Sequence, residues 1–142
     1  NMLYQLLSIL HKTKKSEFES TFIRTNELIK KASELSFTWP NSTSCFKKAE
    51  EEFMELKTAL KEKDCNNIKE EFGDLLFTLL CFADLENLNI FNVLNSANEK
   101  FEKRFNLLKE IASSKNIDLS SASLEIKEQL WFKAKEKYDL SQ

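Results

Sequence analysis

Residues 51–56 read Glu-Glu-Phe-Met-Glu-Leu, and residues 70–75, nineteen positions later, read Glu-Glu-Phe-Gly-Asp-Leu. On a helical wheel of about 100° per residue, the apolar residues around each stretch form a stripe, and the acidic residues lie beside that stripe. The first stripe comprises Ala49, Phe53, Leu56 and Leu60, and the second comprises Ile68, Phe72, Leu75 and Leu79. We therefore expect two helices that pair antiparallel through these stripes, with the carboxylates converging at the rim of one groove.

The composition around this repeat favours an all-α chain. Among 142 residues there is one Gly and one Pro, while 42% of the residues are hydrophobic and 31% are charged. Tight hairpins need residues that accept a positive φ, and a single Gly serves few of them, although Asn can substitute. Twelve Phe and two Trp supply bulk for a core. We predict a helical bundle of about five helices in one domain over residues 16–142, preceded by a lead segment over residues 1–15.

Spacing and capping signals place the helices. Within the lead segment, we expect the apolar residues 2–10 to form a helix that packs on another surface. Ser44 is a candidate cap for the second domain helix, the capping-box pattern at Asn67 starts the third, and Asn89 caps the fourth. The predicted domain helices cover residues 16–35, 45–61, 67–88 and 90–112, followed by a last helix that contains Leu124, Leu130 and Trp131.

Charge and cysteine content exclude several classes of protein. The chain has 21 Lys and Arg against 23 Asp and Glu, a formal net charge of −2, so no overall field attracts nucleic acid or anionic lipid. Three cysteines without a Cys-x-x-Cys pair argue for a reducing compartment and against a zinc site. The apolar segment 2–10 is too short to span a bilayer. We expect a cytoplasmic protein without a nucleic-acid or membrane partner.

The carboxylates of the repeat form a candidate metal site. Four acids brought close together raise their own pKa values unless a cation lies among them. Oxygen-only ligation favours Mg²⁺ or Mn²⁺, and the single histidine, His11, lies too far from the repeat for a di-iron bundle with Glu-x-x-His pairs. The alternative is an ordinary solvated helix face. The four candidate ligands are Glu52, Glu55, Glu71 and Asp74.

Cations at helical spacing point to a phosphate ligand. Lys48 precedes Glu52 by about one helical turn, and Lys100 and Arg104 lie one turn apart near an apolar stripe. A guanidinium near an apolar seam needs an anionic partner, and that partner is either a phosphate or a neighbouring carboxylate. In the last helix Trp131 stands near Lys135, a ring and a cation suited to a nucleobase and a phosphate, although a Trp at helical spacing also serves as core.

Four ordered segments resemble the all-α nucleoside triphosphate pyrophosphohydrolases, specifically the catalytic C-terminal half of MazG. The acidic stretches 51–55 and 71–74 match the family's EExxE and ExxD motifs. The aromatic segment 37–39, the basic stretch 97–105 and the closing segment 122–131 match as well. The resemblance implies an enzyme that hydrolyses nucleoside triphosphates to monophosphate and pyrophosphate in nucleotide clearance, as a homodimer that completes a four-helix core around each site.

The resemblance also implies a role for each candidate residue. It makes Glu52, Glu55, Glu71 and Asp74 the Mg²⁺ ligands. It assigns Lys48, Lys100 and Arg104 to the triphosphate, Trp131 and Lys135 to the nucleotide, and Glu51 and Glu70 to orienting or deprotonating the attacking water. Asn98 contacts substrate or only packs the helix.

Two other functions remain open at this stage. A related enzyme of narrower specificity, such as a dimeric dUTPase or a phosphoribosyl-ATP pyrophosphohydrolase, would use the same carboxylates. A helical interaction module would leave them merely solvated. The only glycine, Gly73, lies inside the third predicted helix at a cost of about 1 kcal/mol relative to Ala. We expect metal, water, substrate or another helix to approach the backbone there.

Overall fold

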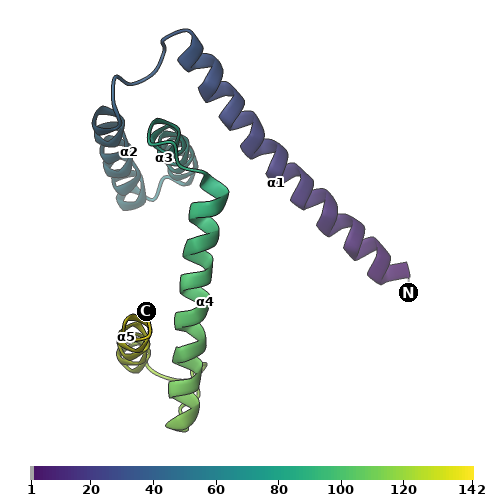
Figure 1. Ribbon diagram of the computed structural model, residues 1–142, viewed down its shortest axis with the longest axis vertical. Helices are drawn as coiled ribbons and strands as arrows, with labels where there is room; N and C mark the ends of the chain where they lie inside the picture. The colour runs from purple at the N-terminus through teal and green to yellow at the C-terminus, as the bar shows by residue number, and fades with distance from the viewer. Residues whose placement is uncertain (1) are drawn as a thin grey trace. The chain divides into compact units, whose positions relative to one another are not determined.

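A computed structural model describes residues 2–142, and of residues 13 and 15 it describes only the backbone. Residue 1, the first of the predicted lead segment, lies outside the described part. Five helices and no strand occur in the described residues, which confirms the all-α prediction (Figure 1). These helices are α1 (Met2–Glu34), α2 (Ser42–Glu62), α3 (Cys65–Leu85), α4 (Ile90–Ser114) and α5 (Leu124–Leu140). The helices form two compact units, one with α1, α2 and α3 and one with α4 and α5.

The first helix is longer than the sequence pattern predicts. Helix α1 runs without a break through residue 16, where we predicted a separate helix to begin. Near its C-terminal end Ile29 is buried, and α1 contacts α3. The predicted packing of residues 2–10 is not found within the described part of the chain, because Met2, Leu6 and Leu10 are exposed. No single helix in the described residues is long and apolar enough to cross a membrane.

Helix caps fix where α2, α3 and α5 begin. The Asn41 side chain accepts a hydrogen bond from the Ser44 amide, so Asn41 caps α2 and the prediction of Ser44 as the cap is wrong. Asp64 likewise accepts from the Asn67 amide, which places the start of α3 before the predicted capping box. In both cases the true cap stands three residues earlier, because a capping side chain reaches forward to the amide of the third helical residue. Ser123 caps α5.

The turns after the helices are made without glycine. Ser36, Lys63, Asn87 and Asn116 adopt φ values between 54° and 60°, the left-handed region that closes a helix. At Lys63 the backbone amide donates to the carbonyls of Ala59 and Leu60, which ends α2 and turns the chain into α3. Two of the four positions are Asn, as expected for a chain with a single Gly.

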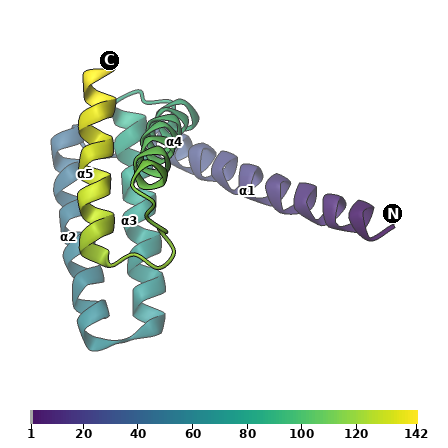
Figure 2. The ribbon, with the colours of Figure 1, turned by 90° about the horizontal axis from the view of Figure 1, so that it is seen from below.

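Helices α2 and α3 form an antiparallel hairpin joined at residues 63–64 (Figure 2). Its seam is built on small side chains, since Cys45, Ala49 and Ala59 are buried, and the Cys45 thiol lies 3.5 Å from the Thr78 carbonyl oxygen. Phe46 and Phe82 meet edge to face with ring centroids 6.1 Å apart.

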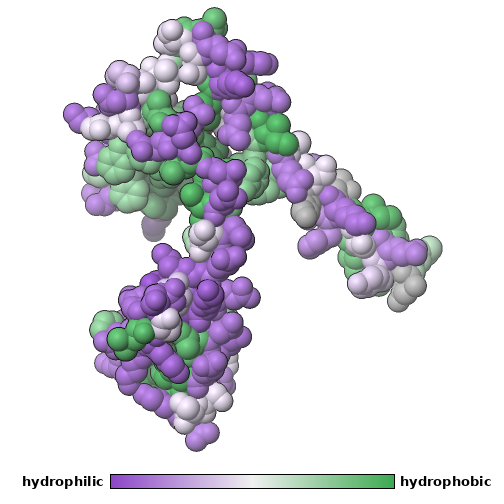
Figure 3. Space-filling model, viewed as in Figure 1, coloured by the Kyte–Doolittle hydropathy of each residue, from purple (hydrophilic) through white to green (hydrophobic). Residues whose placement is uncertain are grey.

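The predicted pairing of the two apolar stripes is therefore wrong in part. Ala49 and Leu56 turn towards the seam, but the larger stripe residues stay outside it, because small side chains let the backbones approach more closely than Phe would. Hydrophobic side chains consequently reach the surface of the hairpin (Figure 3). The exposed members and their exposed fractions are Phe53 57%, Leu60 57%, Phe72 57% and Leu79 44%.

The unit of α4 and α5 has its own small core. Ala112, Leu130 and Ala134 are buried between the two helices. The rings of Phe101 and Trp131 lie 5.7 Å apart between centroids. Trp131 thus contributes to packing within this unit while part of its side chain stays accessible.

Gly73 faces open space in the middle of α3. A Cβ atom added there would meet nothing within 4 Å, so no described residue of this chain makes the approach that we expected. The helix bears the conformational cost of this glycine without a packing contact that requires it.

We predict that Gly73→Ala raises the free energy of unfolding by about 0.5–1 kcal/mol, because Ala favours the helical backbone and its methyl group meets no atom. Urea unfolding of the protein at low micromolar concentration, followed by circular dichroism, measures this change. Unchanged or reduced stability would mean that another surface lies against Gly73.

Candidate metal centre

Three carboxylates from the two helices of the hairpin converge. Glu52 and Glu55 come from α2 and Glu71 comes from α3, and one oxygen atom of each lies within 4.8 Å of the others. Glu52 faces α3 because it follows Ala49 by three residues and Cys45 by seven, the spacing that keeps residues on one helix face. The seam that buries the small side chains thus carries Glu52 into contact with the opposite helix.

Glu52 is a buried carboxylate with one satisfied oxygen. Its side chain is 8% exposed, and Oε1 lies 3.0 Å from Nζ of Lys48, one helical turn earlier. This hydrogen bond lowers the pKa of Glu52 and outweighs the effect of burial, which raises it. Lys48 also lies 3.4 Å from Oε2 of Glu51. The second oxygen of Glu52, Oε2, is buried and has no hydrogen-bond partner in the part of the chain that the structure describes.

Glu71 is the counterpart of Glu52 on α3. Its Oε2 atom is also buried without a hydrogen-bond partner. Burial raises the pKa of Glu71 to about 7, with further contributions from the neighbouring carboxylates of Glu55 and Glu52. In the absence of a cation, the cluster therefore holds a proton near neutral pH.

The donor set fits a hard divalent cation. A buried polar atom without a partner is costly, and Glu52 and Glu71 each leave one such oxygen in the same cluster. Carboxylate oxygens without nearby nitrogen or sulfur donors suit Mg²⁺ or Mn²⁺ rather than zinc or copper. One cation would satisfy both oxygens and replace the proton on Glu71.

The other acids of the repeat lie outside this cluster. Asp74 is exposed and is not among the three residues whose oxygens converge, so its role as a ligand remains a prediction. Glu51 pairs with Lys48 and is otherwise exposed, and Glu70 is exposed. The positions of these two side chains do not test their predicted roles in orienting or deprotonating the attacking water, which stay predictions.

A groove extends from the cluster along the hairpin. It encloses about 250 Å³ and is lined by Met54, Glu55, Thr58, Asn67 and Glu71. Sequence reasoning missed Thr58 and Asn67 as candidates. The available signal was their spacing, because Thr58 follows Glu55 by three residues and Asn67 precedes Glu71 by four, which places each on the same face as its carboxylate.

The remaining candidates belong to the unit of α4 and α5. Arg104 lies with Nη2 3.4 Å from Oδ1 of Asp139, and its guanidinium carbon lies 5.0 Å from the centre of the Tyr138 ring. Its Nε atom is buried without a partner. Arg104 thus has a carboxylate partner, Asp139, which is the alternative to a phosphate. Asp139 could not be identified from the sequence, because it lies 35 residues further along the chain on another helix. Lys100 and Asn98 are exposed, and Lys135 is half-buried on α5.

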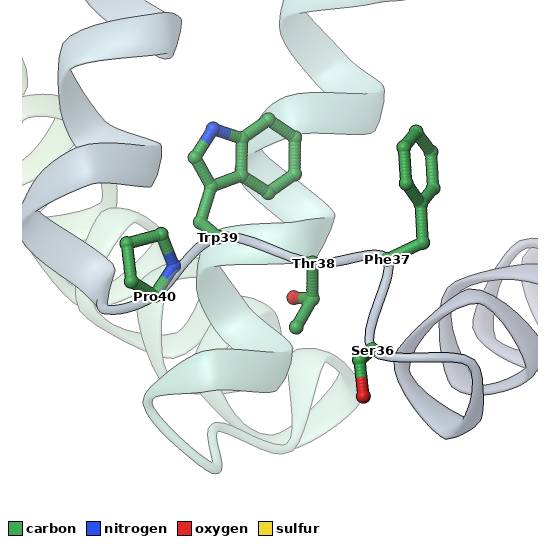
Figure 4. A pocket seen from close by; sticks show the side chains of 5 residues that line it. All are labelled: Ser36, Phe37, Thr38, Trp39 and Pro40. Atoms are coloured by element: carbon green, nitrogen blue, oxygen red, sulfur yellow. The ribbon is translucent and has the colours of Figure 1, made fainter.

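The loop between α1 and α2 carries the aromatic segment of the sequence. Figure 4 shows the rings of Phe37 and Trp39 projecting on the same side of the loop, while Thr38 points away from them. With Ser36 and Pro40 they line a shallow pocket of about 290 Å³. Phe37 is 83% exposed, whereas Trp39 is half-buried.

Comparison with known proteins identifies the segment that carries the cluster. Residues 41–108 match the family model described as the MazG nucleotide pyrophosphohydrolase domain. The chain is 35% identical over 104 residues to a protein of Thermotoga maritima named nucleoside triphosphate pyrophosphohydrolase/pyrophosphatase MazG, a match that covers 73% of this chain and 40% of that protein. It is 28% identical over 115 residues to the nucleoside triphosphate pyrophosphohydrolase of Escherichia coli K12, covering 80% of this chain and 44% of that protein.

A third relative shares the same region. The chain is 38% identical over 71 residues to the uncharacterized protein YabN of Bacillus subtilis, covering 50% of this chain and 14% of that protein. The chain therefore spans less than half the length of each of these three relatives.

The raised pKa of Glu71 predicts how stability depends on pH. In the metal-free protein the folded carboxyl keeps its proton up to about pH 7, whereas the unfolded one loses it near 4.5. The contribution of Glu71 to stability is thus full below about pH 4.5 and is lost as the pH rises to about 7. In chelator, the melting temperature of wild type minus that of Glu71→Gln should therefore fall as the pH is raised from about 4.5 to about 7.

Saturating Mg²⁺ should remove this fall, because the cation takes the place of the proton. If the melting temperature of wild type minus that of Glu71→Gln instead rose with pH in chelator, the raised pKa of Glu71 would be contradicted.

Proposed function

Because residues 41–108 belong to the MazG nucleotide pyrophosphohydrolase family, we propose that the chain hydrolyses nucleoside triphosphates to nucleoside monophosphate and pyrophosphate with the help of Mg²⁺. Water supplies the oxygen, and the phosphoanhydride bond between the α and β phosphorus atoms breaks. Mn²⁺ is a possible substitute for Mg²⁺, since both take oxygen ligands. Clearance of unwanted nucleotides is the corresponding role.

One observation carries the proposal. Within the segment that matches the family, Glu52 and Glu71 belong to one carboxylate cluster, and each keeps a buried oxygen without a hydrogen-bond partner among the described residues. A solvated acidic face, which the interaction-module alternative requires, would leave these oxygens in water. Glu52 is instead one of the two polar residues buried in the described part of the chain.

The residues of the cluster have distinct proposed roles. Glu52, Glu55 and Glu71 hold the cation, and Asp74 joins them as a fourth ligand. A bound Mg²⁺ would neutralise phosphate charge and lower the pKa of the attacking water. Glu51 and Glu70 are the candidates that orient this water or accept its proton.

The cationic and aromatic residues are assigned to the substrate. Lys48 keeps Glu52 ionised and offers a positive charge to a phosphate at the edge of the cluster. Stabilising the oxygens that gain charge as pyrophosphate leaves is the general task of such cations. We assign Lys48, Lys100 and Arg104 to the triphosphate, Trp131 and Lys135 to the nucleotide, and Asn98 to a substrate contact.

We also propose a homodimer in which the hairpins of two copies form a four-helix core. Its support is the apolar surface that α2 and α3 leave exposed, which includes Phe53 and Leu79. These two residues line a groove of about 570 Å³ with Phe46, Met54 and Leu75. Exposed apolar surface of this extent is typical of an interaction site. A cytoplasmic location agrees with the three free cysteines.

Release of pyrophosphate tests the activity. We expect wild type to release pyrophosphate from a panel of nucleoside triphosphates in Mg²⁺ and to release none in chelator. Glu71→Gln should lower kcat/KM by more than about 100-fold, because it removes a charged ligand, and loss of even an outer partner of a metal costs about 10- to 100-fold.

The matched control is Glu62→Gln, an exposed glutamate at the end of α2. Equal rates for wild type and Glu71→Gln would refute the metal site. Activity on one triphosphate alone would support the narrower enzymes, and no activity on any would support the interaction module.

Sedimentation equilibrium tests the dimer. Wild type should have twice the 16.6 kDa mass of the chain, and Phe53→Ser should raise the dimer dissociation constant by at least about 100-fold, because each dimer loses two buried rings. Leu140→Ser, which alters an apolar residue that is 90% exposed at the end of α5, serves as the control. A wild-type mass of one chain at 100 μM (roughly the upper range at which weak dimers are studied) would contradict the proposal.

A further inference from the structure

The groove that leaves the carboxylate cluster changes its chemistry along its length. Lys48 lies at one end of the acidic cluster, beside Glu52. Besides Glu55 and Glu71, the side chains that line the groove are uncharged, namely Met54, Thr58 and Asn67. Thr58 and Asn67 lie nearer than these carboxylates to the turn at residues 63–64. The negative charges of a substrate would therefore find partners at Lys48 and at a cation held by the cluster, and none among these three side chains.

Asn67 is free to bind at the uncharged end. Its backbone amide donates to Oδ1 of Asp64 at 3.1 Å, so the cap of α3 uses the Asn67 backbone and not its carboxamide. The side chain is half-buried, and no hydrogen bond engages the carboxamide among the residues that the structure describes. A carboxamide offers two donors and an acceptor, a pattern that suits a hydroxyl group or the edge of a base.

Thr58 faces the same groove from α2. Its hydroxyl donates to the carbonyl of Met54 at 3.1 Å, which fixes the hydroxyl and leaves its oxygen able to accept. Glu55 and Glu71 stand one helical turn away on the same helices. The groove has a volume of about 250 Å³, so it admits part of a nucleotide and not the whole molecule.

We propose that Asn67, assisted by Thr58, binds the uncharged polar part of the nucleotide, a sugar hydroxyl or a base edge, and so sets the orientation and selectivity of the substrate. This proposal rests on the proposed function. The triphosphate lies over the carboxylates and towards Lys48, and the nucleoside lies towards the turn of the hairpin. A polar group that is left unpaired in a part-buried groove discriminates strongly against ligands that fail to match it.

Two ligands separate the two ends of the groove. An α,β-methylene nucleoside triphosphate cannot be cleaved at the proposed bond and carries a nucleoside, whereas tripolyphosphate carries none. Isothermal titration calorimetry in Mg²⁺ measures the affinity of each ligand for wild type, Asn67→Leu and Asn66→Leu. Asn66 is the matched control because it is the exposed neighbour on the first turn of α3 and does not line the groove.

We expect Asn67→Leu to lower the affinity for the nucleotide analogue by about tenfold, which corresponds to the loss of one or two hydrogen bonds. The affinity for tripolyphosphate should fall by less than about twofold. Asn66→Leu should change neither. Asn67→Ser, which is smaller and polar, should give the same ratio and guards against a folding defect in the leucine variant. A 2′-deoxy analogue distinguishes a sugar hydroxyl from a base edge. If Asn67→Leu weakens binding of the ribose form and not of the 2′-deoxy form, Asn67 binds the sugar hydroxyl. If Asn67→Leu instead removes a difference in affinity between bases, Asn67 binds the base edge.

Other outcomes would overturn the proposal. If Asn67→Leu weakened both ligands equally, Asn67 would serve the phosphate or cation and not the nucleoside. If Asn67→Leu matched Asn66→Leu for both ligands while wild type stayed active, the inference would fail and the proposed function would stand. If wild type released no pyrophosphate and did not bind the analogue, the proposed function would fail and the inference with it.

Discussion

The burial of Glu52 in the seam of the α2–α3 hairpin is the constraint on which the rest of the structure depends. A carboxylate on a side chain that is 8% exposed is tolerated only with a partner, and Lys48 satisfies one of its two oxygens. The other oxygen has no hydrogen-bond partner among the described residues. Glu71, on α3, also keeps an oxygen without a hydrogen-bond partner among the described residues, so the hairpin folds around an acidic cluster whose carboxylates could hold a cation.

Small residues make this arrangement possible. Cys45, Ala49 and Ala59 occupy the seam, which brings the two helices close enough for Glu52 and Glu71 to converge. The same choice turns the large rings of Phe53 and Phe72 away from the seam and leaves them exposed. The candidate site and the apolar surface of the hairpin therefore have one physical cause. Each helix faces the other with the acidic side of its apolar stripe, so the large apolar residues of the stripe point outwards.

Sequence patterns predicted most of the fold, and their errors have local causes. The helices appeared where apolar spacing placed them, but the caps at Asn41 and Asp64 were assigned three residues too late because several Ser and Asn residues near each start can serve as a cap. The break predicted at residue 16 failed because nothing in the backbone interrupts α1 there. Three of the four predicted metal ligands converge, since helical spacing fixes which residues share a face.

The sequence by itself determined the helical class, the paired acidic helices and the resemblance to a nucleotide pyrophosphohydrolase. Composition and periodicity carry this information because they act between residues a few positions apart. Tertiary structure alone decided which side of each stripe faces the seam, which oxygens are left without partners, and that Asn67 and Thr58 share a groove with Glu55 and Glu71. The pairing of Arg104 with Asp139 was likewise decided there. These features depend on how side chains of different size pack across two helices, and no pattern along one helix contains that comparison.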